Sequence, residues 1–187
     1  MVRAGVTVDR LVQAAAELAD SDGLDKVTVS ALARRFGVKD ASLYSHIRNL
    51  RELRVRLALH ASAEMNEAIG AAVAGRSGKD ALVAFADAYR GYALAHPGRY
   101  AATQQRIEPE EITDPAVVLR SVELTQGMLR GYGLAEPELT DAGRLLRAAF
   151  HGYIHIELSG GFHAARPVDD SWARSLDALH RLLENWS

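Results

Sequence analysis

The sequence predicts an all-α protein of about nine helices. Apolar residues recur along most of the chain with the i, i+3, i+4, i+7 spacing of one helical face. No window shows the alternating pattern or the hairpin turns that indicate strands. With 187 residues, of which 48% are hydrophobic and 25% charged, the chain can bury the core of one or two domains. No stretch approaches the roughly 18 consecutive apolar residues that a membrane span needs.

The first part of the chain predicts three short helices and one long helix. Thr7 and Thr28 are suitable N-caps for the first two, and Gly37 is typical of the end of a helix. Asn49 with Glu52 resembles a capping box, which predicts a long helix that begins at residue 50. The predicted helices cover residues 8–19, 29–36, 39–46 and 50–74.

Five more helices are predicted beyond residue 76. Pro97 is expected to end one of them, and Asp114-Pro115 has the N-cap and first-position residues of another. Gly160-Gly161 ends the next, and Asp169 or Asp170 is expected to cap the last. These helices cover about residues 82–93, 99–105, 115–131, 138–159 and 170–186. We therefore expect an N-terminal domain over residues 1–50, a connecting helix over 50–74, and a C-terminal domain over 76–187.

Charge is distributed unevenly between the two parts. Residues 1–60 carry ten Lys/Arg and seven Asp/Glu, whereas residues 61–187 carry twelve and seventeen. Such asymmetry suggests a small basic module on an acidic body. The sequence has no cysteine, so it forms no disulfide, thiolate metal site or cysteine nucleophile. No secretory signal is evident at the N-terminus, and a cytoplasmic protein is expected.

Residues 28–47, TVSALARRFGVKDASLYSHI, have the pattern of a helix-turn-helix with its turn at Gly37. In this motif the second helix enters the major groove of DNA. Tyr44 and His46, at the far end of that helix, can donate hydrogen bonds to phosphates. The apolar positions that hold the helices together are Val29, Leu32, Phe36, Val38, Leu43 and Ile47. The outward positions that face base edges are Lys39, Asp40, Ala41, Ser42 and Ser45.

Arginines surround this predicted DNA-binding surface. They are Arg34, Arg35, Arg48 and Arg51, and phosphate contacts from such residues dominate DNA affinity. Arg3, ahead of the first helix, could reach phosphate or the minor groove. The alternative is a helical interaction protein in which the same helical corner has no DNA role. An enzyme is disfavoured because the chain has no GxSxG motif and no glycine-rich phosphate loop, and no catalytic residue is predicted.

The segment also resembles the TetR family of bacterial repressors. The matching residues are Ala14-Ala15, Leu18, Gly23, Thr28-Val29, Leu32-Ala33, Gly37-Val38, Leu43-Tyr44, His46 and Ile47. The resemblance implies that Thr28, Tyr44 and His46 contact phosphates and that residues 39–42 face the bases. Family members often have a lysine where Leu50 stands, so Arg48 or Arg51 is expected to supply that charge. The resemblance further implies a homodimer that binds a near-palindromic operator, and a repressor that a small molecule releases from DNA.

Residues 76–187 are expected to form the family's ligand-binding and dimerisation domain. Phe150-His151-Gly152-Tyr153 resembles the Trp-His-Gly motif of the WHG-type C-terminal domain, with Phe150 in place of the Trp. Gly152 forms a flat strip with Ala148 and Ala149, which suggests close helix packing in a two-fold four-helix bundle. Aromatic residues that line a ligand cavity, or alternatively fill the core, are Phe85, Tyr89, Tyr92, Tyr100, Phe150 and Tyr153.

His151 and His155 share one helical face, at a spacing that zinc ligands can have. Two histidines cannot fill a metal site alone, and a His-dependent metalloenzyme is the remaining alternative from another class. Packing at a helix interface is the simpler interpretation. We therefore predict no metal site and no resident cofactor.

Overall fold

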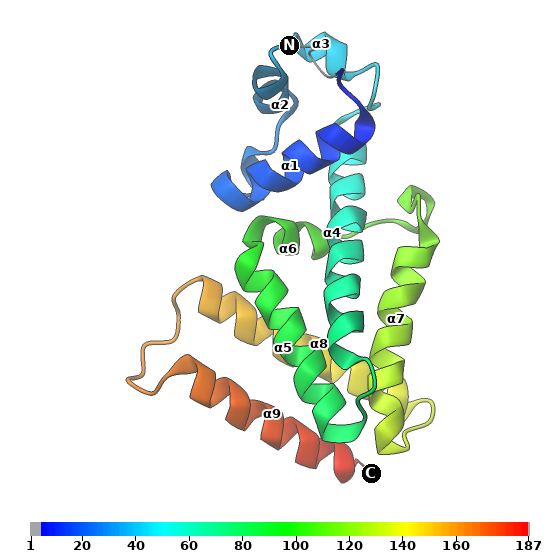
Figure 1. The fold of residues 1–187 in the computed structure, drawn as a ribbon, viewed down its shortest axis with the longest axis vertical. Helices are drawn as coiled ribbons and strands as arrows, with labels where there is room; N and C mark the ends of the chain where they lie inside the picture. Colours follow the sequence, from blue (N-terminus) through cyan, green and yellow to red (C-terminus); the bar gives the residue numbers. More distant parts are fainter. Residues whose placement is uncertain (1–4, 187) are drawn as a thin grey trace. The chain divides into compact units, whose positions relative to one another are not determined.

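The computed structural model describes residues 5–186. Within this range the chain forms nine α-helices and three short 3-10 helices and contains no strand, which confirms the predicted fold class (Figure 1). Arg3 lies outside the described residues. The α-helices are α1 Val8–Asp22, α2 Val29–Phe36, α3 Asp40–Leu43, α4 Leu50–Val73, α5 Gly78–Ala95, α6 Pro97–Thr103, α7 Pro115–Leu129, α8 Glu138–Leu158 and α9 Val168–Glu184. The 3-10 helices are η1 Leu24–Lys26, η2 Pro109–Glu111 and η3 Arg130–Tyr132.

Local capping chemistry sets the ends of the first two helices, as predicted. The Thr7 hydroxyl accepts a hydrogen bond from Arg10 N at 3.3 Å, and the Thr28 hydroxyl accepts one from Ala31 N at 3.2 Å. Helix α2 ends at Gly37, whose φ of 66° lies in the left-handed region that glycine adopts without steric cost. Gly37 therefore fixes how α2 leads into α3.

Helix α3 is shorter than the predicted span of residues 39–46. Only Asp40–Leu43 are α-helical, and Lys39 precedes them as an N-cap without a side-chain hydrogen bond. The chain then continues as a hydrogen-bonded turn, in which His46 N and Ile47 N donate to Leu43 O at 2.9 and 3.1 Å. The helix stops early because the chain must bend there to bury Ile47, which is 2% exposed, before α4 begins.

The chain divides into two compact units. The N-terminal unit consists of the residues up to Glu64 together with His96–Val118, and the C-terminal unit consists of Met65–Ala95 and the residues from Leu119 onward. This division differs from the expected domains of residues 1–50 and 76–187, because α6 and the segment after it pack with the N-terminal helices. Among the described residues, no helix is long and apolar enough to cross a membrane.

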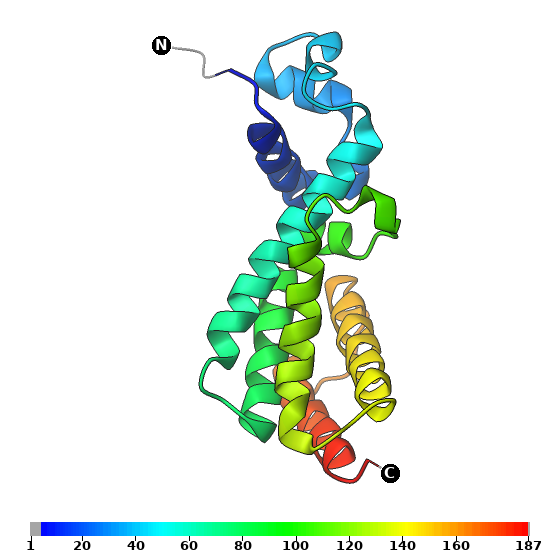
Figure 2. The same cartoon turned by 90° about the vertical axis from the view of Figure 1, so that its right-hand side faces the viewer.

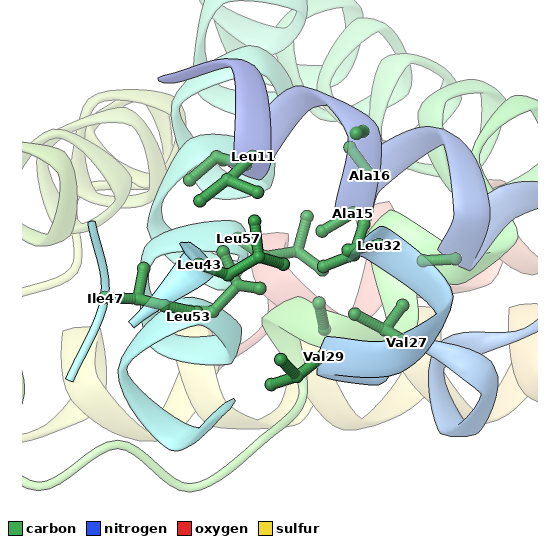
Figure 3. Packing of buried hydrophobic residues seen from close by; sticks show 14 of the residues in the cluster. Leu11, Ala15, Ala16, Val27, Val29, Leu32, Leu43, Ile47, Leu53 and Leu57 are labelled. Carbon is green, nitrogen blue, oxygen red and sulfur yellow. The ribbon is translucent and has the colours of Figure 1, made fainter. Parts of the chain in front are cut away.

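The core of the N-terminal unit is formed by side chains from its first four helices (Figure 3). Leu32 of α2 and Leu43 of α3 are both fully buried, as are Leu53 and Leu57 of α4. On the α1 side the core contains Leu11, Ala15 and Ala16. Leu43 is thus the side chain through which α3 is attached to the rest of the unit.

Helix α6 lies very close to α1 within the N-terminal unit. A Cβ atom added to Gly98 would lie 1.9 Å from the carbonyl oxygen of Ala19, so only glycine fits there. The Asp20 carboxylate accepts a hydrogen bond from Arg99 N at 2.9 Å, and its other oxygen lies 3.2 Å from His96 Nδ1. Arg99 also forms an ion pair with Glu64 at 3.1 Å. These contacts explain why α6 belongs to the N-terminal unit.

In the C-terminal unit, α5 packs against α8 and α9, and α7 lies beside the second half of α4 (Figure 2). A Cβ atom on Gly70 of α4 would lie 3.7 Å from Leu124 Cδ2 of α7. Arg90 of α5 donates to both oxygens of Glu157 on α8 and to Asp169 on α9. This charge cluster connects three helices of the unit.

Candidate nucleic-acid interface

Helix α3 presents its polar positions to solvent while one side chain anchors it. Leu43 is fully buried, whereas the other three residues of α3 are exposed. Lys39 and Ser45, on either side of the helix, are exposed as well. The residues predicted to face base edges, namely Lys39, Asp40, Ala41, Ser42 and Ser45, are therefore all exposed to solvent.

The three predicted phosphate donors differ in exposure. Tyr44 is 54% exposed although it is a large aromatic residue, and nothing in the fold of the unit requires that exposure. Thr28 is exposed, and its hydroxyl accepts the capping bond from Ala31 N, so its proton can still be donated. His46 is half-buried. A hydrogen-bond donor at Tyr44 is the best placed of the three to reach a phosphate.

Some of the basic side chains around α3 are exposed, and some form ion pairs within the unit. Arg34 and Lys39 are exposed, and Arg48, with 85% of its side chain exposed, pairs with Glu52 of the first turn of α4. Arg35 instead pairs with Glu17 of α1. Arg34 and Lys39 are therefore exposed cations of this surface, whereas Arg35 and Arg48 are each paired with a glutamate.

Of the two hydrogen bonds expected for the Asn49–Glu52 capping box, one forms and the other has a different donor. Glu52 N donates to Asn49 Oδ1 at 2.8 Å, as expected, but the Glu52 carboxylate accepts from the backbone N of Arg48 at 2.7 Å. This hydrogen bond is the main reason that the pKa of Glu52 is lowered. The turn between α3 and α4 is thus fixed by its own residues.

Asp40 has a second role that the sequence did not indicate. Its carboxylate accepts a hydrogen bond from the hydroxyl of Ser30, on α2. A carboxylate that points at DNA would repel phosphates, whereas this contact holds the start of α3 against α2. Asp40 is therefore exposed at the predicted reading surface, but one of its two carboxylate oxygens is already engaged.

Arg51 is exposed and has a partner that the sequence did not indicate. We expected it to face DNA, but its guanidinium donates to both carboxylate oxygens of Glu111, at 2.8 and 2.6 Å, and to Arg106 O at 2.6 Å. The hydrogen bond from Arg51 is the largest cause that lowers the pKa of Glu111 to about 2, and the same pair raises the pKa of Arg51. Glu111 lies 60 residues further along the chain, so no local pattern could predict this pair.

The predicted ligand-binding aromatics are only partly assembled. Phe85, Tyr89, Tyr92, Phe150 and Tyr153 belong to the C-terminal unit, whereas Tyr100 belongs to the N-terminal unit. Phe150 lies 6.3 Å from Phe85 and 6.0 Å from Tyr89, measured between ring centroids. Sequence reasoning missed Trp172 and Phe162, whose rings lie 4.9 and 4.7 Å from that of Tyr153. These rings form a packed aromatic cluster.

A groove of about 570 Å³ lies between α5 and α9 of the C-terminal unit. Trp172 is the one aromatic that it shares with the cluster. The groove is lined by Lys79, Val83, Asp87, Arg90, Gly91, Leu94, Asp169, Trp172, Ala173, Leu176 and Asp177. The predicted set and this groove are therefore different parts of the unit.

His151 and His155 lie on one face of α8, with ring centroids 6.0 Å apart. Burial lowers the pKa of His151, and the neighbouring His155 and Arg147 lower it further. Within residues 5–186, no three His, Asp or Glu side chains are grouped so that they could hold a metal ion.

An all-helical chain that exposes the second helix of a helix-turn-helix, next to phosphate donors and cations, belongs to the class of DNA-binding transcriptional regulators. Comparison with known proteins defines that class further. Residues 11–57 match the family model for bacterial regulatory proteins of the tetR family, and residues 82–179 match that for the tetracyclin repressor-like C-terminal domain. The chain belongs to the TetR family.

Relatives and solved structures agree with this assignment. The HTH-type transcriptional regulator YobS of Bacillus subtilis is 30% identical over 177 residues, which cover 93% of this chain and 91% of that protein. BioQ, solved with its double-stranded DNA operator, has a TM-score of 0.71 at 20% identity, over 96% and 99% of the two chains. ActR of Streptomyces coelicolor, solved with actinorhodin, has a TM-score of 0.72 at 20% identity, over 96% and 97%.

Proposed function

We propose that this regulator is a homodimeric repressor that leaves a near-palindromic operator when a small, apolar or aromatic molecule binds its C-terminal unit. The observation that carries the proposal is the exposure of Lys39, Ser42 and Tyr44 on and beside the short helix α3, whose one buried side chain is Leu43. The proposal places the protein in the cytoplasm, where bacterial DNA lies. It includes no catalytic activity, no metal and no resident cofactor.

Substitutions on this surface should change the affinity for DNA in two distinguishable ways. Tyr44→Phe is expected to weaken binding to every sequence by about 1.5–3 kcal/mol, because a hydrogen bond to phosphate carries no base information. Lys39→Ala is expected to cost about 1–3 kcal/mol on the operator alone if the lysine reads a guanine. Fluorescence anisotropy on the region upstream of the gene, with random duplex as competitor, measures both. Equal losses on specific and random DNA for Lys39→Ala would contradict its role as a base reader.

The outward face of α8 supports the dimer. Leu145 and Ile156 are 38% and 41% exposed, and Ala148 lies exposed between them along the helix. A Cβ atom on Gly152 would meet nothing within 4 Å, so that position is open in the single chain. On α9, Leu182 is 43% exposed. Apolar and small residues that the single chain leaves open are suited to a second copy, and paired reading helices would then meet half-sites about 34 Å apart.

Gly152→Trp is expected to disrupt the dimer while each chain stays folded. Overpacking of a helix interface costs about 1–3 kcal/mol, which raises the dimer dissociation constant roughly 5- to 150-fold. Light scattering at micromolar concentration measures the mass, and circular dichroism checks the fold. Gly91→Trp, at another open helical glycine on α5, is the matched control. A wild-type monomer at these concentrations would contradict the proposed dimer.

The aromatic cluster supports an effector site in the C-terminal unit. Ligand pockets are mostly apolar with a few polar groups. The cluster contains such a polar group, because the Tyr153 hydroxyl donates a hydrogen bond to Val168 O at 3.0 Å. The solved complexes of BioQ with DNA and of ActR with actinorhodin show both kinds of ligand on this fold in those proteins.

The experiment that tests the function combines a ligand screen with DNA binding. Metabolites and antibiotics are screened by thermal shift, and each hit is added to the protein on the upstream DNA. A coupling of about 1–3 kcal/mol would weaken DNA binding roughly 5- to 150-fold, and DNA would weaken effector binding equally. Tyr89→Ala should lose the response. Hits that stabilise the protein but leave DNA affinity unchanged would contradict an effector-controlled repressor.

A further inference from the structure

Arg51 and Glu111 form a bidentate ion pair inside the N-terminal unit. Arg51 lies in the first turn of α4, directly after the helix-turn-helix, and Glu111 ends η2. Two parallel hydrogen bonds, of 2.8 and 2.6 Å, join the guanidinium and the carboxylate. Carboxylate and phosphate offer a guanidinium the same planar pair of acceptor oxygens. Glu111 therefore occupies the position on Arg51 that a DNA phosphate would take.

Glu111 is held in place by its own segment. Its carboxylate also accepts a hydrogen bond from Glu108 N at 3.0 Å, which closes the capping box of η2. The same oxygen atom, Oε2, accepts one of the two bonds from Arg51. The fold of the segment and the pairing with Arg51 thus depend on one carboxylate. Since the pKa of Glu111 is lowered to about 2, the pair stays ionised throughout the neutral range.

The pair can open without unfolding the unit. The side chains of Arg51 and Glu111 are 43% and 30% exposed, so water and ions reach both. Exposed ion pairs are weak, and the dense negative charge of DNA competes well for an arginine at its surface. Exchange of Arg51 from Glu111 to a phosphate therefore requires a local rearrangement only.

We propose that Glu111 is an internal competitor of DNA for Arg51. This Arg51–Glu111 latch is closed in the state of low DNA affinity and open when Arg51 binds a phosphate. The inference rests on the DNA-binding repressor function proposed above and assigns a control element to it. Helix α7 begins shortly after Glu111 and continues into the C-terminal unit from Leu119. A displacement of α7 by an effector can thus reach the latch through a short length of chain.

Glu111→Gln tests the latch, because it removes the charge but keeps the shape of the side chain. The probe is a fluorescent duplex of about 30 base pairs of mixed sequence, because a phosphate contact acts on any sequence. We expect about three- to tenfold tighter binding, with the slope of log K against log salt steeper by about 0.9, the value for one added phosphate contact. Arg51→Lys loses the bidentate geometry toward the carboxylate and the phosphate alike, so it should gain less than Glu111→Gln.

Two controls separate the latch from general charge effects. Glu110→Gln removes an adjacent exposed charge that has no hydrogen bond to Arg51, and its effect should stay below about twofold. Arg51→Gln should abolish the gain of Glu111→Gln in the double variant. Equal effects of Glu110→Gln and Glu111→Gln, or a gain that persists in the double variant, would overturn the latch while DNA binding itself stands. A wild type that binds neither this duplex nor its upstream region would instead refute the function, and the latch with it.

Discussion

Gly98→Ala is expected to destabilise the N-terminal unit by about 3 kcal/mol or more and to abolish DNA binding, an effect at the upper end of overpacking mutations. The added methyl carbon would lie 1.9 Å from Ala19 O and 2.5 Å from Asp20 N, and both atoms belong to the backbone. Side-chain adjustment cannot relieve such a contact. Helix α6 would have to leave α1, and the hydrogen bond from Arg99 N to Asp20 would be lost with it.

Urea denaturation followed by circular dichroism measures the loss, and anisotropy on the upstream DNA measures its consequence. Gly91→Ala is the control, because a Cβ atom on Gly91 meets nothing within 4 Å. In the middle of α5, that change should stabilise the protein by up to about 1 kcal/mol through helix propensity. An unchanged unfolding midpoint for Gly98→Ala would show that α6 can shift without cost.

Arg90→Met is expected to destabilise the C-terminal unit by about 2–3 kcal/mol, because it breaks an ion pair that is largely, though not fully, buried. The side chains of Arg90 and Glu157 are only 14% and 18% exposed. The guanidinium donates to Glu157 at 2.8 and 2.5 Å and to Asp169 at 2.7 Å, and it lies over the Trp172 ring. Its removal leaves the carboxylate of Glu157 poorly solvated and without its partner.

Thermal unfolding of paired variants checks this cause. Arg144→Met removes an arginine whose pair with Asp141 is exposed, so it should change stability by no more than about 1 kcal/mol. The double variant Arg90→Met with Glu157→Met should recover most of the loss, because the carboxylate that loses its partner in Arg90→Met is removed as well. If the double variant is as unstable as Arg90→Met alone, the packing of the arginine stem, and not its charge, explains the effect.

Sequence patterns predicted those features that neighbouring residues determine. Thr7 and Thr28 cap their helices because a hydroxyl needs only the amide three residues later. Gly37 ends α2 for an equally local reason. The spacing of Leu32 and Leu43 identified the core of the helix-turn-helix, because one helical face must be buried. The exposed positions of α3 followed from the same periodicity.

Long-range pairing could not be predicted in this way. Gly98 follows Pro97 in a sequence that is typical of any helix start. Nothing in that sequence indicates that the carbonyl oxygen of Ala19 lies against Gly98. The pairs Arg51–Glu111 and Arg90–Glu157 span 60 and 67 residues. Tyr100 was grouped with the C-terminal aromatics on helical spacing alone. Such spacing shows which side of a helix is apolar, but it does not show in which unit that side is buried.

The single turn of α3 has an evolutionary consequence. Leu43 alone is buried there, so substitutions at Lys39, Ala41 and Ser42 leave the core intact and should change stability by no more than about 0.5 kcal/mol each. Under the base-facing role proposed for these residues, descendants of this gene can exchange the DNA sequence that they recognise in small neutral steps. Each duplicate copy can then acquire its own set of target genes while the protein that carries it stays equally well folded.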